Sequence, residues 1–578
     1  MRTKLDLISS KKAASAAFFM LATRYSYALG ILGFALSWLA YDHYRPWVNF
    51  HSEAMSLVGV WFLVLSRSLS SKTGQFVGPR FIGWVMAFAL LPWMQYAFGI
   101  SLFAGDALLA SLYLCGLSAA ICLGYSYAVA SPDRDAALTP VFYVVWIVAL
   151  ASAAIGLLQW LNLQEFLAMY VVQADAGDRA MGNLGQPNQL ATLLLMGMAA
   201  LAWTFEQRRI DRTGLIAGIT LMSIVLVLTQ SRAGMLSALV GGIFLISKNY
   251  TKARRVTPAS IVIWLAAYGL VVQLLPLIHE ILLLSDARRV SFGDNARITI
   301  WKQVLSGISQ APWVGYGWNQ TPTAHAAGSI EVPFSMTYTN AHNVVLDIVA
   351  WVGIPLGLLL TGACLYWFLS RMFAIKETNA VYAMACLLPI AVHSMVEYPF
   401  AYAYFLLAAG LMVGGVEGAY PTRKTMTLSR LWVGGLLALW GVLGSYMVYE
   451  YLLIEEDFRI VRFENLRIGQ TPTEYEVPHV WMLSHMASML QAARQQAAPG
   501  MSAAEMENLR KASLRFSYGS LSLRYALALG LNGDPAGASR QMAIIRGMYG
   551  DYYYQAAVNV MRELQREKYP VLAQVIAP

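Results

Sequence analysis

Polar and ionisable residues gather where long apolar runs begin or end, in four separate parts of the sequence. These segments are Gly182–Gln189, Gln230–Ala233, Asn340–Asn343 and His393–Pro399. Together they present Gln, Asn, Arg, His, Glu and Tyr side chains. Ionisable groups at membrane depth are energetically costly and usually mark a pathway or a site. We therefore expect the four segments to meet in one functional site.

The residue types in these segments suit proton transfer and anion binding. The imidazole of His342 can take a proton from a hydroxyl nucleophile, although a single interfacial histidine is more often a hydrogen-bonded structural residue. The guanidinium of Arg232 can hold a phosphate, or it can snorkel to lipid headgroups. His393 and Glu397 are spaced i,i+4, so a helix would place both on one face. Two residues do not make a metal site, and helix pairing or capping is the expected use.

Other acidic residues have roles that the sequence leaves open. Asp347 follows His342 by five residues, about 140° around a helix, which makes it a poor direct partner for the imidazole but a possible supporting group. Asp42 and Glu53, in the first outside loop, could act as acids or bases. The sequence contains no Walker-type glycine loop, no H-E-x-x-H and no G-x-S-x-G motif. We predict neither a cofactor nor a metal ligand set.

The composition indicates that lipid is the solvent of these segments. Of the 578 residues, 58% are hydrophobic and 13% are charged, and the mean hydropathy is +0.51. Soluble domains carry about 25% charged residues. The net charge of +9 does not indicate a nucleic-acid partner, because the basic residues stand in short runs between apolar spans. The four cysteines lie in apolar stretches, so we expect small buried side chains there.

Apolar runs of bilayer length predict an all-α polytopic membrane protein with about 12–13 transmembrane helices. The run from Ala107 to Ala130 contains no charged residue. The predicted spans centre near Leu32, Phe62, Phe88, Ala119, Ile147, Met196, Ser223, Val240, Ala266, Gly357, Leu387, Leu407 and Ala438.

The distribution of Lys and Arg predicts the orientation of the spans. With the N-terminus inside, basic residues concentrate in the inside loops, as the positive-inside rule requires. They include Arg67, Lys72, Arg80, Arg208, Arg209, Arg212, Lys248, Lys252, Arg254, Arg255, Arg423, Lys424 and Arg430. Thirteen spans place the C-terminus outside, which in a Gram-negative bacterium is the periplasm. The four polar segments then lie on that outer face of the inner membrane.

The chain divides into a membrane domain, residues 1–450, and an outside tail, residues 451–578. Residues 277–340 form a large outside loop with an amphipathic stretch from Arg297 and a Trp-rich run after Pro312, as expected of a lid on the membrane surface. In the tail, Leu521–Leu531 and Ala536–Met548 flank a Gly-Pro turn. This pattern predicts a helix–turn–helix that resembles one tetratricopeptide-like pair.

At these motifs the chain resembles the superfamily of O-antigen ligases, O-antigen polymerases and protein O-oligosaccharyltransferases. The ligase-like part runs from Ser231-Arg-Ala-Gly, through Arg297-x-x-x-Trp301 and Pro312-Trp-Val-Gly-Tyr-Gly, to Ala341-His-Asn343. The segments Gly182–Ala191 and His393–Pro399, with the soluble tail, resemble the PglL-type protein-glycosylating branch. The resemblance covers most of the chain from about Gln173 onward.

The resemblance implies a GT-C-like helix bundle and a function. Such enzymes move a preassembled glycan from an undecaprenyl-pyrophosphate carrier to an acceptor, here Ser or Thr of periplasmic or pilin-like proteins. It implies that His342 is the catalytic base and that Arg232 and Arg297 bind the pyrophosphate. Residues implied to contact the donor or acceptor are Gln186, Asn188, Asn343, Glu397 and Tyr398.

Two alternatives stay open, one to the protein acceptor and one to glycan transfer itself. The same machinery serves a ligase to lipid A-core or a polymerase of O-antigen repeats, and the outside tail favours a protein acceptor because a folded substrate needs a docking surface. A transporter for lipid-linked glycan is the alternative from another class. Transporters often contain internal repeats and broken helices near the midplane. No clear internal repeat is present, and the polar residues lie at one face.

Overall fold

The computed structural model describes residues 2–71, 75–130, 138–175, 177–250, 254–281, 296–420, 425–472 and 475–575. Side chains are described from residue 19 onward, except that of residue 168. Lys72, Lys252, Arg423 and Lys424 of the predicted inside loops lie outside these ranges, as does the stretch 282–295 of the predicted large loop.

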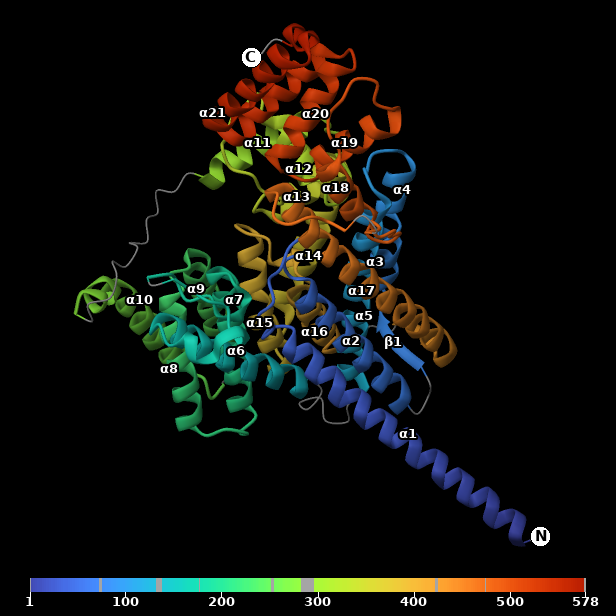
Figure 1. Ribbon diagram of the computed structural model, residues 1–578. Coiled ribbons are helices and arrows are strands. Elements are labelled where there is room, and N and C mark those ends of the chain that lie inside the picture. The colour runs from blue at the N-terminus through green and yellow to red at the C-terminus, as the bar shows by residue number, and fades with distance from the viewer. Residues whose placement is uncertain are drawn as a thin grey trace.

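The chain folds almost entirely into helices, and each of the thirteen predicted span centres falls within one of them (Figure 1). In the part that holds these centres the helices are α1 (Arg2–Leu36), α2 (Phe50–Ser70), α3 (Ile82–Phe88), α4 (Leu91–Ala97), α5 (Ala104–Ala130), α6 (Thr139–Trp160), α7 (Pro187–Glu206), α8 (Arg212–Leu228), α9 (Arg232–Asn249), α10 (Pro258–Ile281), α14 (Ile354–Ala374), α15 (Thr378–Ser394), α16 (Ala403–Gly418) and α17 (Arg430–Leu466). The described strands are β1 (Gln75–Pro79) and β2 (Thr425–Ser429), which pair antiparallel with Gln75 opposite Ser429.

Eight helices within the described ranges are long and apolar enough to cross a bilayer, and four shorter apolar helices accompany them. The long ones belong to α1, α2, α5, α6, α7, α10, α14 and α17. The shorter ones are the α3–α4 pair taken together, α8, α15 and α16. The predicted fold class, an all-α polytopic membrane protein, is confirmed.

Close packing of α5 against α16 fixes the centre of the bundle. Glycines at the crossing allow it: a Cβ added to Gly124 would stand 2.1 Å from the carbonyl oxygen of Leu411, and one added to Gly414 would stand 2.1 Å from that of Ile121. Small residues let helix backbones approach in this way. Next to this pair, α7 is buried along nearly its whole length and packs against α6, α8, α9 and α15. Its N-terminal end, at Pro187, is therefore rigidly positioned.

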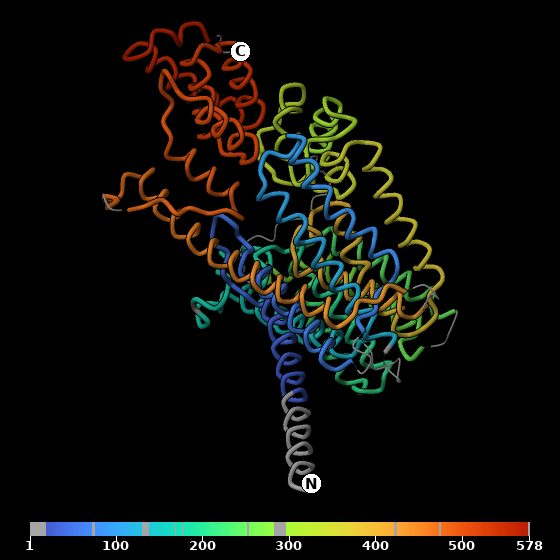
Figure 2. Tube along the Cα trace, turned by 90° about the vertical axis from the view of Figure 1, so that its right-hand side faces the viewer, coloured from blue at the N-terminus to red at the C-terminus, as the bar shows by residue number. Residues whose placement is uncertain are grey.

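A second layer of helices covers one end of the bundle. It contains α11 (Ala296–Gln310), α12 (Thr321–Gly328), α13 (Val344–Val352), α18 (Ser484–Arg494), α19 (Ala503–Arg515), α20 (Gly519–Leu531) and α21 (Pro535–Glu567). Short 3-10 turns complete the described helical elements: η2 (Gln164–Tyr170), η3 (Gly182–Leu184), η4 (Pro399–Ala401) and η5 (Pro570–Gln574). The tail helices α18–α21 and the helices α11–α13 lie beside one another at this end, whereas α1 runs toward the opposite end (Figures 1 and 2).

The tail is fastened to both the large loop and the bundle. The predicted helix–turn–helix corresponds to α20 and α21, and α21 bends at Gly550. The backbone N–H of Phe334, in the large loop, donates to the carbonyl of Gly547 at 2.8 Å. Arg515 of the tail binds the buried carboxylate of Asp106 in α5 at 2.9 Å. The helix α17 runs without interruption through residues 450 and 451, where the sequence divides the chain.

Candidate functional site

Glu397 is the centre of the polar cluster. It lies in the turn between α15 and η4 and is only 5% exposed. One carboxylate oxygen, Oε2, accepts a hydrogen bond from Nδ1 of His342 at 2.7 Å. The other, Oε1, accepts from Arg297 Nη2 at 2.5 Å and from Asn188 Nδ2 at 3.2 Å. A single buried carboxylate thus joins residues from three distant segments.

The partners of Glu397 keep it ionised. Burial raises the pKa of a carboxyl group, but here the hydrogen bonds from His342 and Arg297 and the charge of the guanidinium outweigh burial and lower the pKa of Glu397 to about 2. A carboxylate can only accept hydrogen bonds, so Nδ1 of His342 carries the proton. In the neutral imidazole the Nε2 lone pair is then the basic position.

The backbone around His342 holds its ring in place. His342 has a φ of 53°, in the left-handed region that costs a non-glycine residue of order 1–3 kcal/mol. Two neighbours fix this conformation. The backbone N–H of Ala341 donates to Oδ1 of Asp347 at 2.8 Å, and Oδ1 of Asn343 caps α13 by accepting from the N–H groups of Val345 and Leu346. Local strain of this kind clusters at functional sites.

Asp347 is a buried support rather than a direct partner of the imidazole. Its Oδ1 also accepts from the Thr321 hydroxyl at 2.7 Å. Burial raises the pKa of Asp347 to about 7, and the bonds from Ala341 and Thr321 oppose that rise only in part. Asp347 therefore ties the backbone beside His342 to α12, in agreement with a supporting role.

Asn188 connects Glu397 to the loop before α9. Its Oδ1 accepts from the Ser231 hydroxyl at 2.7 Å and from Arg179 Nη2 at 3.2 Å. Ser231 is also the N-cap of α9, where its hydroxyl oxygen accepts from the N–H of Gly234. Arg232 follows as the first residue of α9 and is half-buried. The predicted residues Asn188, Arg297, His342 and Glu397 thus form one hydrogen-bonded cluster, with Arg232 next in sequence to a member.

Three helix N-termini surround this cluster. The helices α7, α9 and α13 begin at or beside Asn188, Ser231 and Asn343, each of which bonds within the cluster or to its edge. Helix N-termini carry partial positive charge and exposed N–H donors. Together with the guanidinium groups of Arg179 and Arg297, they make the cluster suitable for a multiply charged anion.

Tyr398 and Gln186 lie at the borders of the cluster. The ring of Tyr398 meets that of His342 edge-on at 5.0 Å between centroids and stacks on Tyr402 at 5.8 Å. Gln186 is the half-buried residue before α7, in an extended conformation, and its side chain does not cap that helix.

Some expectations for individual residues are wrong. His393 and Glu397 do not share a helix face, because α15 ends at Ser394 and Glu397 lies in the following turn. Nδ1 of His393 instead pairs with the Thr192 hydroxyl at 2.8 Å. The Asn343 amide caps α13 with its oxygen and donates to the carbonyl of Met395 at 3.1 Å, and its contact with the donor or acceptor stays a prediction. Glu53 is not in a loop: it lies buried in α2 and accepts from Trp47 and Tyr113.

Sequence reasoning missed Arg179 as a member of the cluster. Besides its bond to Asn188, its Nε donates to the carbonyl of Thr229 at 2.6 Å. Arg179 stands in an irregular polar stretch without periodicity, so only its closeness in sequence to Gly182–Gln189 could have drawn attention to it.

Comparisons with known proteins match the same parts of the chain. A family model described as O-antigen ligase matches residues 217–361, one described as virulence factor membrane-bound polymerase, C-terminal, matches 381–563, and one described as protein glycosylation ligase matches 180–205. These ranges contain every residue of the cluster except Arg179.

Two curated relatives come from Acinetobacter baylyi. A general O-oligosaccharyltransferase is 29% identical over 452 residues, which are 75% of this chain and 76% of that protein. A ComP-specific O-oligosaccharyltransferase is 26% identical over 381 residues, 64% of this chain and 66% of that protein.

Proposed function

We infer that this chain is a PglL-type O-oligosaccharyltransferase of the O-antigen ligase superfamily, a membrane enzyme that transfers a lipid-linked glycan to hydroxyl groups of protein. In finer detail, the donor is an undecaprenyl-pyrophosphate-linked oligosaccharide, and the acceptor is a Ser or Thr of a periplasmic or pilin-like protein. The reaction takes place at the periplasmic face of the inner membrane, with the N-terminus in the cytoplasm and the tail in the periplasm.

His342 is the general base of the transfer. A Ser or Thr hydroxyl is a weak nucleophile, and a positioned imidazole removes its proton as the new bond forms. Glu397 holds Nδ1–H of His342, which orients the ring and stabilises the imidazolium that develops. Nε2 is then the atom that receives the proton.

Arg297 and Arg232 hold the pyrophosphate. Guanidinium groups match phosphate oxygens with paired donors and do not lose their charge. Arg297 already lies beside His342 through their shared carboxylate, and the N-terminus of α9 adds N–H donors beside Arg232. Gln186, Asn188 and Tyr398 border the sugar or the acceptor, and Asn343 shapes the backbone that carries His342.

The bond changes balance without a further reactant. The acceptor oxygen attacks the anomeric carbon of the first sugar, and the bond from that carbon to the phosphate oxygen breaks. The bonding electrons leave with the pyrophosphate, where the arginines stabilise the added charge. The hydroxyl proton passes to Nε2 of His342.

One observation carries this proposal: His342, Arg297 and Asn188, from three segments far apart in sequence, converge on the buried carboxylate of Glu397. A base and an anion-binding group within one hydrogen-bonded cluster are what glycan transfer from a lipid phosphate requires.

The test is protein glycosylation in cells that lack their own transferase but supply a lipid-linked glycan and a pilin-like acceptor. Wild-type protein should modify the acceptor, and His342→Ala should not, while His479→Ala, at an exposed tail histidine, should match wild type. Membrane levels and gel filtration of the variants confirm folding. Full activity of folded His342→Ala would refute the mechanism, and modification of lipopolysaccharide without any protein would refute the acceptor.

A further inference from the structure

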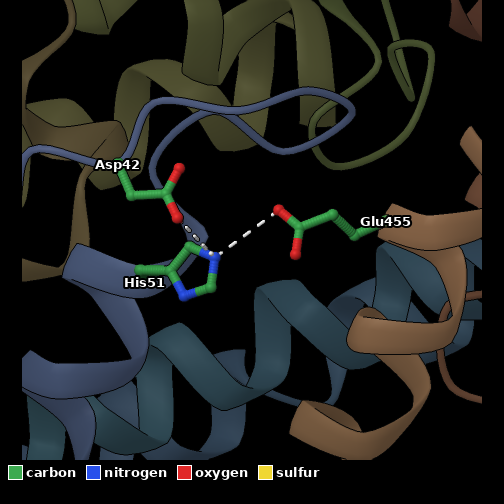
Figure 3. Close-up of side chains that lie close together, drawn as sticks. All are labelled: Asp42, His51 and Glu455. Carbon is green, nitrogen blue, oxygen red and sulfur yellow. Dashed lines mark ion pairs between the residues drawn. The ribbon is translucent and has the colours of Figure 1, made fainter. Parts of the chain in front are cut away.

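Asp42, His51 and Glu455 form a second cluster, which the proposed reaction does not use. Asp42 lies in the loop after α1, His51 in the first turn of α2, and Glu455 in α17, and their side chains point toward one another (Figure 3). Nε2 of His51 stands 3.3 Å from Oδ2 of Asp42 and 3.5 Å from Oε1 of Glu455, and the three atoms all lie within 4.8 Å of one another.

These distances fit ligands around an ion better than hydrogen bonds. A charge-assisted N–H···O bond is about 2.7–2.9 Å long. A tetrahedral zinc ion with bonds of 2.0–2.2 Å keeps its ligand atoms roughly 3.3–3.5 Å apart. Both measured separations from Nε2 lie in the second range. Ordinary hydrogen bonds do not satisfy these atoms either. Nε2 of His51 and Oε1 of Glu455 are sealed from solvent and have no hydrogen-bond partner within the described part of the chain.

The charges of the Asp42 and Glu455 carboxylates also favour a bound cation. Two carboxylates so close together repel each other. One divalent ion would balance both charges and would satisfy the two buried atoms. Asp42 is 45% exposed at its side chain, so the site keeps an access route and room for a water as fourth ligand.

The surroundings hold the ligands rigidly. Tyr451, one turn before Glu455 on α17, is fully buried and stacks on Phe50, the residue before His51, with 3.7 Å between ring centroids. Its hydroxyl donates to the carbonyl of Trp47 at 3.2 Å. Two of the three ligands thus come from packed helices, the arrangement that metal sites need.

We propose that Asp42, His51 and Glu455 bind one divalent transition-metal ion, zinc by preference, which clamps the tail-bearing helix α17 to the first loop. One nitrogen and two carboxylate ligands suit zinc and disfavour magnesium and calcium, which bind oxygen ligands almost exclusively. The site is structural and separate from the transfer chemistry, since none of its ligands contacts the Glu397 cluster among the described interactions.

The clamp would also fix the wall of a neighbouring cavity. A cavity of about 430 Å³ is lined by His43, Tyr44 and Arg45 from the same loop and by Phe458 and Arg462 from the same helix. His43 Nε2 hydrogen-bonds the backbone carbonyl of Asn183 at 2.7 Å, within the Gly182–Gln189 segment that borders the catalytic cluster. Metal binding would therefore order the path from the tail to that segment.

Metal content of the full chain tests the proposal. The protein is purified in detergent without a polyhistidine tag, stripped with chelator, and dialysed against micromolar zinc with millimolar magnesium before elemental analysis. Wild type should retain one zinc per chain. His51→Gln and Glu455→Gln should bind it roughly a hundredfold more weakly or not at all. If His51→Gln or Glu455→Gln fails to fold, Asp42→Asn, at an exposed loop position, tests the same loss of zinc binding.

Matched controls separate this site from adventitious binding. His479→Gln, at an exposed tail histidine, and Glu456→Gln, at the position next to Glu455, should keep the full zinc content. Zinc should also raise the thermal unfolding midpoint of wild type and controls but not of the ligand variants. Absence of zinc from wild type, or equal zinc in ligand variants and controls, overturns the proposal. Transfer activity enters neither readout, so this result is independent of the proposed enzyme function.

Discussion

Replacing Glu397 with Gln probes the contact on which the mechanism depends. The substitution keeps the shape of the side chain but removes the charge that faces Nδ1 of His342 at 2.7 Å. Charge centres about 4 Å apart attract by about 4 kcal/mol at an effective dielectric constant of 20. That stabilisation of the imidazolium corresponds to about a 10³-fold rate factor. His342 is 21% exposed, and screening by water lowers the expected factor to about 10².

The assay is transfer of a lipid-linked glycan to purified acceptor in detergent, with kcat and KM measured separately. Glu397→Gln should lower kcat by about 10²-fold, because the charge that stabilises the developing imidazolium is lost. The KM for the donor should change much less, because the Gln oxygen can still accept the hydrogen bond from Arg297. The matched control is Glu417→Gln. Glu417 is also buried and pairs with Arg371 at 2.5 Å, but it lies at the far end of α16, a helix about 24 Å long. The control should lower stability and leave kcat unchanged. A fall of less than tenfold for Glu397→Gln, or an equal fall for both variants, would refute the reasoning.

Three further predictions follow from the same contacts. Asn188→Ala removes the link between Glu397 and the loop before α9 and should lower kcat/KM about tenfold, the value of one or two hydrogen bonds, in the same transfer assay. Burial raises the pKa of Asp347 from 3.8 to about 7, so the folded protein holds a proton that the unfolded chain releases near pH 4. The free energy of unfolding should therefore fall as the pH rises from about 4 to 7, by at most about 4 kcal/mol. Asp347→Asn should flatten that pH dependence of the thermal midpoint, and an unchanged pH profile would contradict the burial argument. Arg515→Met leaves the buried charge of Asp106 without its ion partner and should lower the free energy of unfolding by about 3–5 kcal/mol, measured as a lower thermal midpoint. The control Arg510→Met, in an exposed pair on the same helix, should lower it by under about 1 kcal/mol. Equal midpoints for the two variants would contradict the predicted difference.

The sequence predicted the helices and the segments of the site because both follow from the cost of polarity in lipid. A span must be apolar for about 20 residues, so even the centres near Ser223 and Val240 fall inside helices. The same cost makes an arginine or histidine at a span end stand out. This cost marks the segments that contain His342 and Asn188, whereas the role of Arg297, which lies outside the four segments, is implied only by the resemblance.

The organisation of the site could not be predicted, because it depends on where helices end and how they pack. The i,i+4 spacing of His393 and Glu397 assumes a continuous helix, but α15 stops at Ser394 and a turn precedes Pro399. That turn aims Glu397 at His342, which is 55 residues away in the chain. No local pattern encodes this contact.

The cluster of Asp42, His51 and Glu455 could not be predicted from the sequence either. Asp42 and His51 are close in sequence, but Glu455 belongs to residues 451–578, which the sequence assigns to a separate tail. Only the continuity of α17 past residue 451 and its packing on Phe50 bring the third ligand to the loop. Sequence spacing therefore could not indicate a metal site.

The central claim is that His342 serves the proton transfer while the arginines serve the donor. Donor binding and single-turnover transfer, both measured on one preparation of purified His342→Ala, test it most directly. The account predicts a donor Kd close to that of wild type together with transfer reduced at least about 10³-fold. Transfer at the wild-type rate, or loss of donor binding as the sole defect, would contradict it.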